Sequence, residues 1–183
     1  MKKTIVFWLM LLVAATSFEV TAEQDIDGML LRNFLDIEHP QFFETVDGAT
    51  RYSPLKAYQA SSQIYVDLRT RLNADQVDAN DMKRMLFFAY SASVRKAAAS
   101  LEALNTDLMP ILQKHPDLFL QTLKTNPQFV ASVCYNLGRY FGFENKHQGE
   151  LPQFLRGYKN RIKNTLEASD AKICLKIMKK NAR

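Results

Sequence analysis

Two cysteines, Cys134 and Cys174, are the residues of this sequence with the most specific chemistry. They do not form a C-x-x-C redox motif, and no clustered pair of histidines accompanies them as in a zinc site. An even number of cysteines in an exported chain is typical of a structural disulfide. On the chain-entropy model, closing a loop of forty residues stabilises the folded state by about 4 kcal/mol. We therefore expect a disulfide between them, with two buried thiols as the alternative.

Carboxylates are the next residues that could do chemistry. Four of them lie within twelve residues near the N-terminus: Asp36, Glu38, Glu44 and Asp47. A pair of carboxylates can hydrolyse a glycosidic bond, and a cell-wall substrate would suit an exported protein. Closeness in sequence does not place two carboxylates across a substrate, so a solvated acidic surface is the favoured interpretation. The sequence contains no G-x-S-x-G motif and no Walker or G-x-G-x-x-G loop. We predict no catalytic residue and no cofactor.

The three histidines do not form a metal-binding pattern. None belongs to an H-E-x-x-H motif, and no two have the spacing of ligands on one helix face. His39 and His115 each precede a proline and are interpreted as residues at helix entries. His147 lies in a polar stretch and is interpreted as solvated. We predict no metal site.

Positive charge is concentrated at the C-terminal end of the chain. Residues 151–183 hold nine Lys or Arg and two Asp or Glu, a net of +7, so the other residues sum to −2 in a chain of net charge +5. A final helix capped by Ser169 would place Ile173, Cys174, Ile177 and Met178 on one face. The predicted partner-binding residues on the opposite face and on the preceding helix are Arg156, Lys159, Lys172, Lys176, Lys179 and Lys180.

This basic region has several interpretations. An acidic protein surface is one partner that it would suit. Peripheral contact with an anionic membrane is another, although the last helix has no Trp or Phe to insert. The predicted export disfavours nucleic acid. A solvated lysine face that keeps the protein soluble is the alternative to any binding site.

Two further candidates for partner contacts lie on the helix predicted from Pro127 to Phe141. Its inward stripe contains Phe129, Val133 and Leu137. Tyr135 and Arg139 lie off that stripe, and Tyr and Arg are enriched at the centres of protein interfaces. Core packing is the alternative role for the neighbouring aromatic residues.

The N-terminus has the layout of a secretory signal peptide. Lys2 and Lys3 precede an apolar run over 5–15, and Val20 and Ala22 match the −3 and −1 positions of a cleavage site. We expect residues 1–22 to be removed and residues 23–183 to form a single domain in the periplasm or outside the cell. An uncleaved N-terminal anchor is the alternative.

Helical signals recur through residues 23–183. Apolar residues make up 47% and charged residues 23% of the chain, which is typical of a globular protein. The spacing of apolar residues predicts helices over about 26–35, 53–72, 81–104, 127–141, 152–166 and 169–183, with short helices beginning near Thr106 and Pro116. The segment around Val46-Asp47-Gly48 reads as a turn within a loop. We predict an all-α fold, a compact bundle of six to eight helices or a solenoid-like variant of it, with one disulfide.

These observations together predict an exported helical module that acts by contact with another protein. Toxin-neutralising immunity proteins and enzyme inhibitors are analogies of class, and no motif here is specific to them. An envelope hydrolase that uses the N-terminal carboxylates is an alternative. A helical carrier of an apolar or lipid ligand is another.

Overall fold

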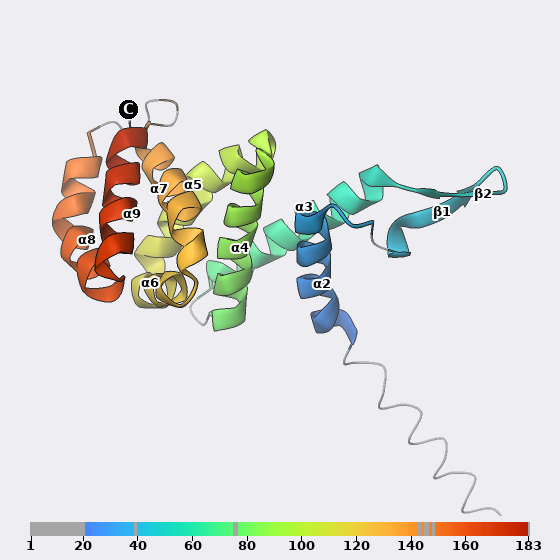
Figure 1. The fold of residues 1–183 in the computed structure, drawn as a ribbon, viewed down its shortest axis with the longest axis horizontal. Coiled ribbons are helices and arrows are strands. Elements are labelled where there is room, and N and C mark those ends of the chain that lie inside the picture. Colours follow the sequence, from blue (N-terminus) through green and yellow to red (C-terminus); the bar gives the residue numbers. More distant parts are fainter. Residues whose placement is uncertain are drawn as a thin grey trace, which may run out of the picture. The chain divides into compact units, whose positions relative to one another are not determined.

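The computed structural model of the chain describes residues 21–182, apart from positions 39, 75–76, 143, 145–146 and 148, and gives residues 21–25 as backbone only. Residues 1–20 of the predicted signal peptide, and also His39, lie outside the described residues. Eight α-helices, α2 to α9, two short 3-10 helices and one β-hairpin make up the described part of the chain (Figure 1). The predicted all-α fold and disulfide are confirmed. Contacts divide the chain into two compact units, Met1–Ser61 and Ser62–Arg183.

The first unit contains a hairpin that the sequence analysis missed. Helix α2 (Thr21–Leu35) is followed by the 3-10 helix η1 (Pro40–Phe42), strands β1 (Phe43–Val46) and β2 (Ala49–Tyr52), and the start of α3 (Pro54–Leu72). The strands pair antiparallel, with Val46 opposite Ala49, around a two-residue turn. Asp47 and Gly48 both have positive φ, 51° and 76°, as the favoured hairpin turns require. Both strands are mostly exposed on both faces, so they lack the apolar alternation by which a strand is recognised.

The helix predicted over 81–104 is wrong, because the chain breaks at Lys96. Helix α4 (Ala79–Arg95) ends there and α5 (Ala98–Lys114) begins two residues later. Lys96 has a φ of 55°, its N–H donates to the carbonyl of Ser93, and the N–H of Ala97 donates to that of Ala92. These two bonds form a Schellman motif, which glycine usually closes and lysine closes here. The N-cap of α4 is Asp78, whose side chain accepts from the N–H of Asn80.

Two other predicted helix starts are also wrong. Thr106 does not begin a helix, because α5 runs through it and holds Pro110 in its interior. Ser169 does not cap the last helix, α9 (Ala168–Asn181), whose N-cap is Glu167. The remaining elements are α6 (Pro116–Thr125), the 3-10 helix η2 (Pro127–Phe129), α7 (Val130–Gly142) and α8 (Leu151–Thr165).

The C-terminal part of α3 packs into the second unit. Leu68 and Leu72 are fully buried there. The Tyr65 hydroxyl donates to Asp107 Oδ2 on α5 at 2.5 Å, and burial, reinforced by this bond, raises the pKa of the phenol. Arg71 donates twice to the carboxylate of Asp81 on α4, at 2.6 and 3.1 Å. Apolar burial and these polar pairs together fix the end of α3 against α4 and α5.

Candidate functional site

Helix α9 presents a lysine face to solvent, as predicted. Lys172, Lys176, Lys179 and Lys180 are all exposed. The opposite side of the helix buries Ala171, Cys174, Leu175 and Met178. The placement of Ile173 on the buried face is wrong, because that side chain is 43% exposed and Leu175 lies in the core instead. The buried stripe is therefore rotated toward α8 relative to the prediction.

Helix α9 is fixed closely against α7. The disulfide joins Cys134 on α7 to Cys174 on α9. One turn further along both helices, Gly138 lies against the backbone of Met178, and a Cβ on that glycine would be 2.8 Å from the Cα and the carbonyl oxygen of Met178. Because contacts advance in the same direction along both helices, α7 and α9 run parallel, and both are seen side by side in Figure 1. This packing makes α9 a rigid support for its exposed side chains.

A groove of about 760 Å³ runs between the end of α8 and the solvent side of α9. Its apolar floor consists of the exposed Ala168 and of the edges of Ala171 and Leu175, which are otherwise buried. Four lysines form its rim: Lys163, Lys172, Lys176 and Lys179. We call this feature the lysine-rimmed groove. It brings together three of the lysines predicted from sequence and adds Lys163, which the prediction did not include.

The groove is strongly positive. No carboxylate belongs to its lining, and among the described residues none lies within ion-pair distance of the four rim lysines. Within the part of the chain that the structure describes, these exposed ammonium groups therefore have no carboxylate partner. A shallow apolar floor within a ring of such charges is suited to an anionic group that also carries an apolar part.

Helix α8 extends the positive charge beyond the groove. Arg156, Lys159 and Lys163 recur at intervals of three and four residues, so they lie on one side of the helix. Arg156 and Lys159 are exposed but do not line the groove. Arg161 belongs to another side, where its guanidinium donates twice to the carboxylate of Asp117 on α6, at 3.1 and 3.0 Å. The spacing of Arg156 and Lys159 was the signal that could have identified Lys163.

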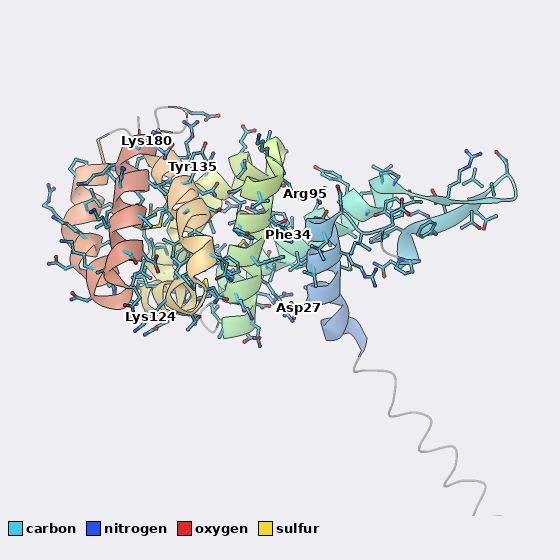
Figure 2. The ribbon with its side chains drawn as sticks, viewed as in Figure 1. Asp27, Phe34, Arg95, Lys124, Tyr135 and Lys180 are labelled. Atoms are coloured by element: carbon cyan, nitrogen blue, oxygen red, sulfur yellow. A yellow bond between two sulfur atoms is a disulfide. The ribbon has the colours of Figure 1, made fainter. Side chains whose placement is uncertain are left out.

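The predicted residues Tyr135 and Lys180 lie in a second, smaller groove of about 520 Å³. Figure 2 labels both side chains, which come from the adjacent helices α7 and α9. Further lining residues come from α4, the α4–α5 junction and α5: Ser93, Lys96 and Leu101. Arg139 is half-buried and lines neither groove. Of the predicted partner-binding residues, three therefore line the lysine-rimmed groove, two line the second groove, and Arg139, Arg156 and Lys159 line neither.

Among the four N-terminal carboxylates that were candidates for hydrolysis, Glu44 is engaged by neighbouring side chains. Glu44 forms an ion pair with Lys56, and hydrogen bonds from Lys56 and Ser53 lower its pKa. A general acid needs a raised pKa, so this environment opposes a proton-donor role for Glu44. Among the described residues, no group of three His, Cys, Asp or Glu side chains is arranged to hold a metal ion.

The environment of His147 differs from the prediction. Its ring is half-buried and stacks on Tyr140, with ring centroids 4.1 Å apart, and its Nδ1 lies 3.1 Å from Glu150 Oε1. His115 begins α6 as predicted, and its buried Nε2 has no hydrogen-bond partner. Each of these histidines has a packing role at a helix end.

Within the described part of the chain, no helix has the length and apolar character needed to cross a bilayer. No protein family, curated protein or solved structure shows detectable similarity to this chain.

Proposed function

We propose that this protein is an exported binding module that recognises an acidic protein partner through the lysine-rimmed groove. One observation carries the proposal: four lysines, with no carboxylate partner among the described residues, surround an apolar floor on a helix fixed to the bundle by a disulfide. A site with this chemistry favours a segment that combines Asp or Glu with an apolar side chain. The segment places its apolar side chain on Ala171 and Leu175 and its carboxylates near the lysines.

The mechanism is occlusion of an acidic surface. Positive charge around the groove attracts a negative partner and raises the rate of association, while the apolar floor contributes to the lifetime of the complex. Because α9 is held by the disulfide and by close packing on α7, little conformational entropy is lost when the groove is occupied. An inhibitor or an immunity-type protein acts in this way when the covered surface belongs to an active site.

The test compares two matched charge reversals in purified protein that begins at Glu23. Lys172→Glu with Lys176→Glu alters the groove. Lys83→Glu with Lys124→Glu makes the same change in net charge at exposed lysines elsewhere on the second unit. Each protein is used to capture partners from envelope extract. It is also titrated with a synthetic helical peptide that has one Leu stripe flanked by Glu.

The wild-type protein and the control protein, Lys83→Glu with Lys124→Glu, should capture the same acidic protein and bind the peptide. Moderate salt should weaken both interactions. The affinity of the Lys172→Glu, Lys176→Glu protein for the peptide should be lower than that of the wild type by a factor of about ten or more. Equal binding by the two charge-reversed proteins would contradict the proposal. Thermal unfolding of each variant checks that the fold is unchanged.

A lipid carrier is a second candidate that the same groove supports. Its volume of about 760 Å³ lies in the range of small-ligand sites, and its apolar floor and ammonium rim match an anionic amphiphile. Native mass spectrometry of the purified protein would then show one bound lipid, and the groove pair would lose it. Repeated recovery of protein without bound lipid favours the protein partner.

A further inference from the structure

The first unit exposes apolar side chains that it does not bury itself. Among its described residues, Leu30 is the only buried apolar side chain. Seven large apolar side chains there are between 41% and 64% exposed: Leu31, Leu35, Ile37, Phe43, Val46, Leu55 and Tyr58. Exposed apolar groups at this density mark a surface that contacts another molecule.

The charges of the two units are opposite. Residues 21–61 contain three Lys or Arg and seven Asp or Glu, a net of −4. Residues 62–183 contain nineteen Lys or Arg and eleven Asp or Glu, a net of +8. Two copies of the first unit would repel each other if they met face to face. The first unit of one copy is instead attracted to the second unit of another.

The C-terminal end of α2 matches the chemistry of the lysine-rimmed groove. Leu31 and Leu35 are one helical turn apart on the exposed side, about 6 Å along the axis. The groove floor from Ala168 to Leu175 extends about 10 Å along α9, which is longer than the spacing of the two leucines, and Ala168 is its exposed apolar residue. The exposed Glu38 follows in the next segment and supplies a carboxylate for the rim.

The turn after α2 keeps these groups together. The N–H of Ile37 donates to the carbonyl of Arg32 at 2.9 Å, and Asp36 has a φ of 61°. The helix therefore ends in a closed turn, and exposed Ile37 follows directly between two acidic residues. Apolar and acidic groups alternate here within a short, structured segment.

We propose that the segment Leu31–Glu38 of one copy occupies the lysine-rimmed groove of a second copy. The two contacting surfaces are different, so the contact is head-to-tail, and repetition produces a ring or an open chain of molecules. This inference rests on the proposed function, because it assigns an occupant to the same groove. An external partner would then compete with the protein's own acidic segment.

The decisive experiment mixes two variants that are each unable to self-associate. The segment variant is Leu31→Ser with Leu35→Ser, and the groove variant is Lys172→Glu with Lys176→Glu. Sedimentation velocity at low salt should show concentration-dependent assemblies for the wild type. The self-association of each variant alone should be weaker than that of the wild type by a factor of about ten or more. An equimolar mixture should form a complex of two chains and nothing larger, because one intact segment meets one intact groove.

Matched controls keep the result interpretable. Val94→Ser removes an exposed apolar side chain from the second unit, and the pair Lys83→Glu and Lys124→Glu reverses charge away from the groove. Both control proteins should associate as the wild type does. Wild-type protein that stays monomeric at every concentration overturns the inference, and so does assembly that survives in the groove variant.

The acidic peptide probe separates this inference from the proposed function. If the peptide binds the groove and the wild-type protein is monomeric, the proposed function stands and self-association is refuted. If the peptide fails to bind but the two variants complement each other, the groove is specific to its own chain. If both tests fail, both proposals fall.

Discussion

Replacing Gly138 with alanine tests how closely α7 and α9 are packed. A Cβ at this position would be 2.8 Å from the Cα and the carbonyl oxygen of Met178, and 3.2 Å from Cβ of Asn181. Two of these three atoms belong to the backbone, so no rotamer change removes the clash. The disulfide one turn earlier also opposes any retreat of α9. The helices must separate, or α7 must bend.

Two opposing effects set the change in the free energy of unfolding caused by Gly138→Ala. Alanine is favoured over glycine inside a helix by up to about 1 kcal/mol. Overfilling a packed contact costs about 1–3 kcal/mol, and the upper part of that range applies because backbone must move. We therefore expect a net loss of about 1–2 kcal/mol. For a domain of this size, that loss lowers Tm by roughly 3–8 °C.

Urea and thermal unfolding measure this difference, and Gly157 supplies the matched control. Gly157 also lies inside a helix, and a Cβ there would meet no atom within 4 Å. Gly157→Ala should therefore stabilise the protein by about 0.5–1 kcal/mol. If Gly138→Ala is as stable as the wild type while Gly157→Ala is more stable than the wild type, the close approach of α7 and α9 is refuted.

The same substitution can show whether the disulfide holds the contact rigid. In protein with Cys134→Ala and Cys174→Ala, α9 is free to shift, so the cost of Gly138→Ala should fall by about half. Removing the disulfide alone should cost about 4 kcal/mol on the chain-entropy model. An equal cost of Gly138→Ala in both backgrounds would show that packing alone, and not the covalent link, fixes the helix separation.

Two further predictions concern the polar groups that anchor α3. The raised pKa of Tyr65 means that its hydrogen bond stabilises the fold fully below about pH 10 and that this contribution is lost as pH rises further. Urea unfolding at pH 7 should give Tyr65→Phe a free energy of unfolding about 1–2 kcal/mol below that of the wild type. Above about pH 10, the free energy of unfolding should fall less steeply with pH in the variant than in the wild type. An equally steep fall in both proteins would exclude this role for Tyr65. Asp81→Asn removes a 6%-exposed carboxylate that accepts from Arg71 and from buried Arg84, and should cost about 3 kcal/mol in the same assay. A loss below about 0.5 kcal/mol would show that the ion pairs contribute little.

Elements with strong local signals were predictable from sequence. The lysine face of α9 follows from helical periodicity, and the cysteine pairing follows from an even count together with the predicted signal peptide. Helices α3 and α6 begin at Pro54 and Pro116, where proline suits the first turn. In each case the residue type and the local conformation agree.

The break at Lys96 was not predictable from local signals, because lysine carries a helix through most contexts and glycine is the usual sign of a left-handed cap. Ala97, Ala98 and Ala99 strengthened the expectation of one long helix. Tertiary packing favours two shorter helices here, since α4 contacts α6 and α7 while α5 also packs on α7. Packing of this kind overrides helix propensity.

The tripeptide Pro-Gln-Phe shows how far local information reaches. It occurs at 40–42 and at 127–129, and forms a 3-10 turn at both places. A strand follows the first copy and a helix follows the second. The tripeptide therefore determines its own turn, while the next element depends on whether the following side chains meet a core.

The candidate site was predictable only in part, for the same reason. The periodicity of a single helix predicts that the lysines of α9 share an exposed face. The groove needs α8 and α9 in one particular register, which depends on the turn at Leu166 and Glu167 between them. That register brings Lys163 to the rim and separates Lys180 into another groove.

The link between Cys134 and Cys174 also closes the chain into a covalent ring. All of α8 and the first half of α9 lie within this ring. Four residues of the lysine-rimmed groove belong to it, namely Lys163, Ala168, Ala171 and Lys172, whereas Leu175, Lys176 and Lys179 follow the second cysteine. A protease that cuts one peptide bond between the two cysteines does not release a fragment. The severed ends remain tethered to the bundle, and the buried contacts of α9 can still hold the groove together. A single cut of this kind therefore leaves the two parts of the chain joined for as long as the disulfide is intact.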